Sequence, residues 1–211
     1  MSTVDPSQHP AERFESRLEF ETLISDLSSK FVDLPAAEVD SQIEDAQRRV
    51  CEFLGVDRSV VWQWSSATPP VATPTHIYFA QEIAGSAGSL RADFFPWIRQ
   101  ELLAGRRVVI PSLEELPAEA AVDRENARRL GINSGVILPL SVRGEPPVGI
   151  LSFTTLRAQR DWPAALVKRL ALVAQVFTSA LLRNRQELRL QERDARLAAA
   201  GPRGDLRRLG R

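Results

Sequence analysis

Hydrophobic residues in the first quarter of the chain recur with the spacing of an α-helix. Apolar side chains fall three or four positions apart from residue 20 to residue 31, which predicts an amphipathic helix that Pro35 prevents from continuing. A second stripe over residues 39–54 predicts another helix, and Gly55 follows it where a left-handed residue would close a helix. The two stripes consist of Phe20, Leu23, Ile24, Leu27 and Phe31, then Val39, Ile43, Ala46, Val50, Phe53 and Leu54.

The hydrophobic period then changes from about 3.6 to about 2 residues, which indicates β-strands. Val60, Trp62 and Trp64 alternate with their neighbours and predict a first strand. Residues 65–74 are rich in proline and are predicted as a loop, and residues 75–83 are predicted as the partner strand.

The clearest strand pair lies in the second half of the chain, over residues 134–153. Two apolar runs flank a Gly-Glu-Pro-Pro turn at residues 144–147, which predicts a β-hairpin. Pro139 lacks a backbone N–H, so it places its strand at a bulge or leaves one side of the strand unpaired. Before the hairpin, a helix is predicted around residues 97–104 and a short strand around residues 107–110.

A long amphipathic helix is predicted from Trp162 onward, and a seven-residue repeat overlies its amphipathic pattern. Two interpretations of the repeat remain open. It could be the seam of a coiled coil between two copies, or one helix could cover the sheet with its first half and lie in solvent with its second half. The repeat consists of Val167, Ala174, Leu181, Leu188 and Ala195, with Leu170, Phe177, Asn184 and Gln191 at the complementary positions.

Short connections between the predicted strands favour an antiparallel sheet with helices packed on it, which is an α+β fold. The length of 211 residues allows one domain with extensions. We expect a disordered lead over residues 1–17, a domain over residues 18–182, and a helical extension with a basic tail over residues 183–211.

The order of these elements resembles the GAF domain, a small sensory module of bacterial signalling proteins. The matching segments are RRLGINSGVILPL at residues 128–140, VGILSF at 148–153 and WPAALVKRLALVAQVFTSALLRNR at 162–185. In addition, FPWIRQELLAGRRVVIPSLEELP at 95–117 resembles GAF variants that precede PAS domains, histidine kinases or enhancer-dependent transcription activators. The resemblance implies a GAF-like antiparallel β-sheet flanked by helices, with long N- and C-terminal helices.

Composition limits the cellular environment and the binding partners that we expect for this protein. Acidic and basic residues are equal at 27 each, so no overall field attracts nucleic acid or a membrane. No export signal is apparent, and no run approaches the roughly 20 apolar residues that a membrane span needs. A single cysteine cannot form an internal disulfide, so we expect a cytoplasmic protein that binds neither nucleic acid nor membrane.

The sequence offers few parts for catalysis, and we expect no enzyme activity, no catalytic or metal-binding residues and no cofactor. The only histidines are His9 and His76, of which His76 is expected to be a half-exposed strand residue. Cys51 is interpreted as a small buried hydrophobic residue. GAF members that reduce methionine sulfoxide use several cysteines, and members that attach bilin use a central one, so Cys51 matches neither.

The resemblance implies a ligand pocket between the sheet and the helices over one of its faces. The candidate pocket residues are Trp62, Trp64, Trp97, Ile110, Leu138 and Ser152. Aromatic walls with a few polar groups suit a small molecule, although Trp62 and Trp64 on one strand face are equally well explained as core residues.

The sequence therefore favours a non-catalytic sensory or regulatory GAF domain that binds an unknown small molecule and signals through its terminal helices. The partner would be a kinase or transcription regulator, as in two-component signalling or transcription control. The alternative is a ligand-free dimerisation scaffold of such a protein. For a homodimer the candidate interface residues are Leu27, Phe31, Phe177, Leu181 and Leu188.

Overall fold

The computed structural model describes residues 10–64, 71–80, 90–91, 93–142 and 145–199. Its α-helices are α1 (Pro10–Val32), α2 (Val39–Leu54), α3 (Pro96–Leu103), α4 (Ala121–Arg129) and α5 (Ala164–Ala199). Its strands are β1 (Arg58–Trp64), β2 (Val71–Phe79), β3 (Leu90–Arg91), β4 (Val108–Ile110), β5 (Ser134–Leu140) and β6 (Gly149–Thr155). Short 3₁₀ turns lie at Ala36–Glu38, Leu113–Glu115 and Ala118–Ala120.

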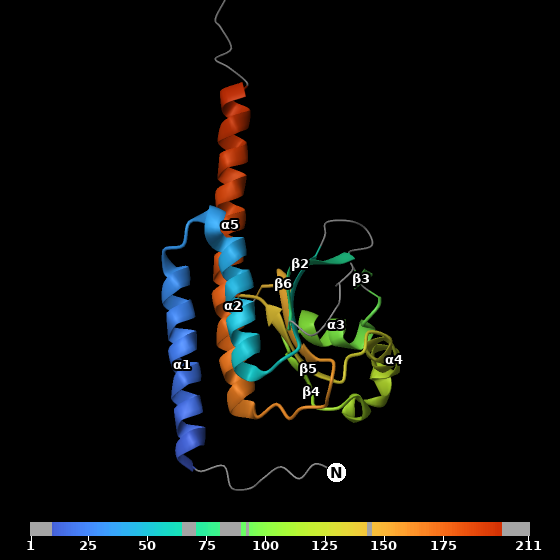
Figure 1. Ribbon diagram of the computed structural model, residues 1–211. Coiled ribbons are helices and arrows are strands. Elements are labelled where there is room, and N and C mark those ends of the chain that lie inside the picture. The colour runs from blue at the N-terminus through green and yellow to red at the C-terminus, as the bar shows by residue number, and fades with distance from the viewer. Residues whose placement is uncertain (1–9, 65–70, 81–89, 92, 143–144, 200–211) are drawn as a thin grey trace, which may run out of the picture.

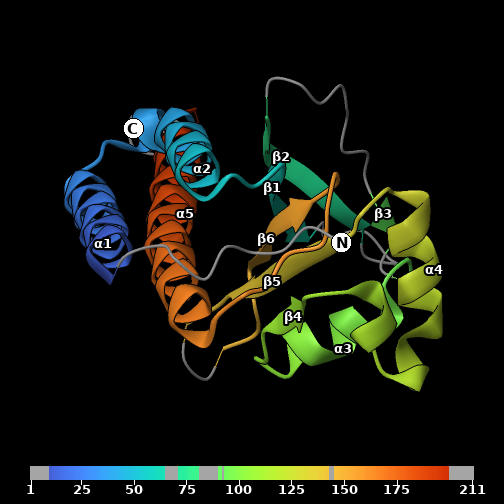
Figure 2. The same ribbon diagram turned by 60° about the horizontal axis from the view of Figure 1, so that its bottom comes forward.

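Within these residues the strands form one antiparallel sheet in the order β3-β2-β1-β6-β5-β4. Figures 1 and 2 show α1, α2 and α5 on one side of the sheet and α3 and α4 on the other. We call these the terminal-helix face and the α3/α4 face. This architecture confirms the predicted α+β fold.

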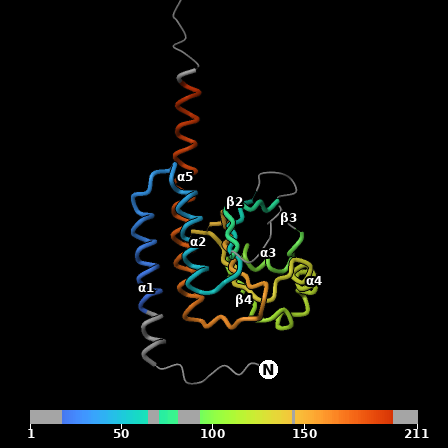
Figure 3. The backbone as a smooth tube through the Cα atoms, in the orientation of Figure 1, coloured from blue at the N-terminus to red at the C-terminus, as the bar shows by residue number. Residues whose placement is uncertain are grey.

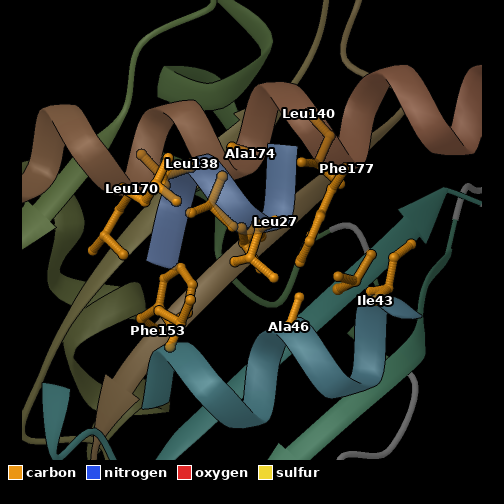
Figure 4. Close-up of a cluster of buried hydrophobic side chains, with 14 of the residues drawn as sticks. Leu27, Ile43, Ala46, Leu138, Leu140, Phe153, Leu170, Ala174 and Phe177 are labelled. Carbon is orange, nitrogen blue, oxygen red and sulfur yellow. The ribbon is translucent and has the colours of Figure 1, made fainter. Parts of the chain in front are cut away.

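The terminal-helix face carries the larger core. Alternate residues of β5 and β6, including Leu138, Leu140 and Phe153, pack beneath α2 and the first half of α5 (Figure 4). Helix α1 lies on α5 and α2 on the side away from the sheet, as the backbone trace also shows (Figure 3). Its apolar stripe is therefore buried against other helices, where the rings of Phe31 and Phe177 lie 5.7 Å apart.

The α3/α4 face carries a second, smaller core, in which α3 and α4 pack over β4 and the neighbouring strands. Its buried residues are Ile98, Leu102, Val108, Ile110, Leu113, Leu116, Ala120, Ala127 and Ile132. The two cores lie on opposite faces because successive side chains of a strand point in opposite directions.

The hairpin at residues 134–153 is confirmed as β5 and β6. Pro139 lies where β5 has no partner on its outer side, because the last pair between β4 and β5 is Val108 with Ile137. Other boundaries differ from the prediction. Strand β2 begins at Val71, inside the predicted loop, and α1 begins at Pro10, inside the expected lead. Residues 1–9, 65–70 and 200–211 lie outside the described residues.

Among the described helices, the stretch Ala164–Leu197 in α5 is long and apolar enough to cross a membrane by length and composition. The sequence prediction that no run approaches this length was therefore too strict. Most apolar residues of α5 as far as Leu181 pack in the terminal-helix core, although Leu172 is 48% exposed, so packing accounts for much of the apolar composition of this half. The second half of α5 extends past the domain, and Leu188 there is 51% exposed (Figure 1).

Candidate functional site

The α3/α4 face of the sheet presents an unusual row of polar groups at its centre. In β1 the residues that point to this face include Arg58, Val60 and Trp62, which pair with Thr154, Ser152 and Ile150 of β6. Because alternate residues of a strand point to the same face, the hydroxyl groups of Ser152 and Thr154 in β6 lie beside the long side chains of Trp62 and Arg58 in β1.

Both long side chains of β1 bind these hydroxyl groups across the strands. The indole N–H of Trp62 donates to Ser152 Oγ at 3.2 Å, and Arg58 Nε donates to Thr154 Oγ1 at 3.0 Å. Ser152 and Thr154 are buried, with 9% and 4% exposure. The two contacts fix the ring and the guanidinium over β6, so the geometry of the site is set by adjacent strands.

The guanidinium of Arg58 is the most unusual group of the site. Burial lowers the pKa of Arg58, which means that its surroundings oppose the positive charge. Within the described part of the chain, no carboxylate lies within ion-pair distance of Arg58, and its guanidinium donates to the neutral hydroxyl of Thr154. A partly buried cation without an acidic partner is costly, and an anion that bound beside it would relieve that cost.

A buried carboxylate in α4 fixes the position of α3 on this face of the sheet. Asp123 accepts the backbone N–H groups of Trp97 at 3.1 Å and Ile98 at 2.9 Å, so it satisfies the first turn of α3. Burial raises the pKa of Asp123 more than these hydrogen bonds lower it. Asn126, one turn further along α4, donates to the carbonyl oxygen of Phe94 at 2.6 Å. These contacts position Trp97 at the start of α3.

The structure brings together some of the candidate pocket residues and separates one. Trp62 and Ser152 are in contact, and Trp97 and Ile110 belong to the apolar cluster of the same face. The Nε1 atom of Trp64, two residues beyond Trp62, is buried without a partner among the described residues. Leu138 belongs to the opposite, terminal-helix core (Figure 4), so it cannot line a pocket on the α3/α4 face.

Four of the five candidate interface residues are core residues of the protomer itself. Leu27, Phe31, Phe177 and Leu181 are at most 3% exposed, because α1 covers α5 within one chain. Packing between helices of one protomer therefore covers these four residues, which leaves almost no exposed surface at them for a second copy. Only Leu188 of this set is exposed, and it lies in the extending half of α5.

Cys51 and His76 both lie on the terminal-helix side. Cys51 is 1% exposed, and burial raises the pKa of its thiol. His76 is 3% exposed, not half-exposed as expected, because its ring lies between β2 and α2 with Nε2 3.1 Å from Asp40 Oδ1. Among the described residues no group of three or more His, Cys, Asp or Glu side chains could hold a metal ion.

Arg58 is the site residue that the sequence interpretation missed. Its signal was present, since Arg58 is in phase with Val60, Trp62 and Trp64 and so points to the same side of the strand. A charge at an otherwise apolar face of a strand is the pattern that would have found it.

Comparisons with known proteins agree on the fold. A family model described as the GAF domain matches residues 38–181. A search of curated proteins found no match.

Solved structures with the same fold include the photosensory core module of a Stigmatella aurantiaca phytochrome, at 18% identity and a TM-score of 0.67, covering 84% of this chain and 38% of that one. The phycoerythrobilin-bound GAF domain of a cyanobacterial phytochrome matches at 15% identity and a TM-score of 0.65, covering 80% and 96% of the two chains. The GAF domain region of a putative membrane protein from Geobacter sulfurreducens matches at 17% identity and a TM-score of 0.56, covering 69% and 93%.

Proposed function

The chain belongs to the GAF domain family, and we propose that it is a non-catalytic sensory or regulatory domain that binds a small anionic molecule on its α3/α4 face. The observation that carries the proposal is the guanidinium of Arg58, partly buried beside Thr154 and without a carboxylate partner in the described part of the chain. An anionic group of a ligand would supply that partner. The rings of Trp62 and Trp97 would contact its apolar part.

The ligand would be held without a covalent bond to cysteine. Some similar structures are bilin-bound, but Cys51 is the single cysteine of this chain. It is buried on the opposite face of the sheet. A bilin, if it binds, would therefore be held by charge and stacking alone.

The proposed site lies next to a contact that reaches α5. Asp57, adjacent to Arg58, accepts the backbone N–H groups of Leu156 at 2.7 Å and Arg157 at 3.1 Å. These two residues begin the connection from β6 to α5, and Arg160 in the same connection donates to the carbonyl oxygen of Leu54. A ligand that prefers one position of β1 would thereby shift the population of positions of α5, which is the proposed signal.

Thermal denaturation with a panel of carboxylate and phosphate metabolites tests the ligand-binding proposal. A ligand present at a hundred times its Kd adds about 2.7 kcal/mol to the stability of the folded state. Arg58→Gln should remove the effect of the active compound, and Trp97→Ala should weaken it, while Arg129→Gln on the exposed side of α4 should leave it unchanged. A panel without any stabilising compound, or one whose effect survives Arg58→Gln, would refute the proposal.

The alternative function is a ligand-free dimerisation scaffold for a kinase or transcription regulator. The extending half of α5 favours it, because Leu188, Leu190 and Leu197 are each more than half exposed there, at 51%, 52% and 64%. Leu188→Asp should dissociate such a homodimer without unfolding it. Leu181→Asp, by contrast, should unfold the protomer, because Leu181 is only 3% exposed in its core. Sedimentation that shows a monomer of the unaltered chain would exclude the scaffold.

A further inference from the structure

A concave site lies at the β4 end of the sheet, outside the site proposed above. It has a volume of about 480 Å³ and lies between α5, the outer end of β5 and the turn from α3 to β4. Figure 2 shows β5 and α5, two of the elements that border it, side by side. The lining residues are Gly105, Arg106, Arg107, Leu138, Pro139, Ser141, Ala171, Ala174, Gln175 and Thr178.

The groove exists because β4 is too short to cover β5. Pairing between the two strands ends at Val108 and Ile137, so the outer side of β5 is uncovered from Leu138 onward. Opposite this edge α5 presents the small side chains of Ala171 and Ala174, which leave the space open. The floor is thus apolar, and Ser141, Gln175 and Thr178 add polar groups around it.

The charged side chains that line the groove are both arginines, Arg106 and Arg107. Arg106 is neutralised by Glu101, since its Nε lies 2.7 Å from Glu101 Oε2 in the turn that ends α3. Arg107 is exposed and makes no ion pair within the described residues. None of the described residues that line the groove is acidic. A net positive charge therefore faces the cavity from its α3–β4 side.

We propose that this groove binds a small organic anion, a carboxylate or a phosphate ester with an apolar body, whose charge lies at Arg107 and whose body rests on Leu138, Ala171 and Ala174. The volume falls within the range of about 300–1,000 Å³ that is usual for small-molecule sites. An added peptide strand fits less well, because Pro139 has no backbone N–H to donate to it.

Occupation of the groove would act directly on α5. The ligand would contact both α5, at Ala171, Ala174 and Gln175, and the turn between α3 and β4. It would thereby link two segments that lie on either side of the groove. The groove thus gives the domain a second input to its C-terminal helix that does not pass through Arg58.

Chemical-shift mapping of the full chain tests the proposal with benzoate and phenyl phosphate as probes and benzylamine as the cationic control. Either anion should shift the amide signals of Gly105, Arg107, Ser141 and Gln175, and benzylamine should not. A response to benzoate alone or to phenyl phosphate alone identifies the anionic group, and a response to both shows that charge and apolar body suffice.

Arg107→Glu should weaken the apparent Kd by about tenfold or more, as the loss of a charge-assisted contact predicts. Gln175→Glu provides a second variant with the same expected direction. Arg129→Glu, a change of equal charge on exposed α4, and Arg58→Gln should both leave the response unchanged, which separates this groove from the site on the α3/α4 face. Shifts located elsewhere, equal shifts with benzylamine, or full binding by Arg107→Glu would overturn the proposal.

Discussion

Replacement of Asp57 by alanine should destabilise the domain more than replacement of an exposed acid, because Asp57 is buried and joins the start of β1 to the connection that leads into α5. Its carboxylate is 3% exposed. One oxygen accepts the backbone N–H groups of Leu156 and Arg157, and the other accepts Arg157 Nε at 2.8 Å. The alanine variant would lose these contacts and also the ion pair between Arg157 Nη2 and Asp57 Oδ1 at 2.7 Å.

The expected cost follows from the surroundings of each donor. The partly buried N–H of Leu156 would be left without a partner, which costs about 1–3 kcal/mol. Arg157 is exposed, so water can replace Asp57 at its backbone and its guanidinium, and these contacts contribute little. We therefore expect Asp57→Ala to lose about 1–3 kcal/mol, or roughly 2–12 °C in Tm for a domain of this size.

The pH dependence of stability gives a second test of the same contact. Burial opposes the ionisation of Asp57, but the hydrogen bonds from Leu156 and Arg157 outweigh it and hold the pKa of Asp57 below its ordinary value of 3.8. The contribution to stability is therefore fully present above that value and is lost as the pH falls through the lower pKa of the folded state. Asp57→Asn, which cannot ionise, should lose less stability than the unaltered protein over this acidic window.

Urea denaturation followed by tryptophan fluorescence measures both effects. Asp45→Ala is the control, because within the described residues Asp45 pairs with the exposed Arg48 on α2, and its loss should cost about 0.5 kcal/mol or less. The reasoning fails if Asp57→Ala is as stable as Asp45→Ala. It also fails if Asp57→Asn and the unaltered protein respond identically to acid.

Three further outcomes are expected. Gly149→Ala should cost about 3 kcal/mol or more in urea denaturation, because its Cβ would clash with the backbone carbonyl oxygen of Trp62, which cannot move without distorting β1; an unchanged midpoint would contradict the strand register. Asp123→Ala should cost about 1–3 kcal/mol through the unsatisfied first turn of α3, with Asp123→Asn costing less. Burial raises the pKa of Asp123 in the folded state, so the contribution of Asp123 to stability is complete below its unfolded pKa and declines as the pH rises through its folded pKa. Asp123→Asn should remove that decline when stability is measured over a series of pH values. Cys51→Ala should keep the fold at a cost of about 1–2 kcal/mol, and the native thiol should not react with an aromatic disulfide reagent until the protein unfolds.

The sequence was sufficient for the elements whose signals are local. The period of the apolar residues predicted α2, the first half of α5 and the β5–β6 hairpin, because a helix or strand buries one side of itself whatever lies against it. The change of period at Val60 marked β1 for the same reason. The ordered combination of these segments also carried the resemblance to the GAF family, which the match over residues 38–181 confirms.

The tertiary structure decided which helices cover each side of the sheet, and this could not be derived from periodicity. Alternation along β5 predicts that Leu138 and Ile137 point to opposite faces of the sheet, but it does not predict that α5 covers Leu138 and α3 covers Ile137. For that reason the candidate pocket combined residues of two faces. The stripes of α1 and α5 likewise indicated burial without naming a partner, and the structure shows that they cover each other within one chain. The importance of Arg58 likewise could not be derived from the sequence. Its charge is unusual because two strands pack around it and because no carboxylate lies nearby among the described residues. The cost of a buried charge depends on such neighbours, and they are distant in sequence.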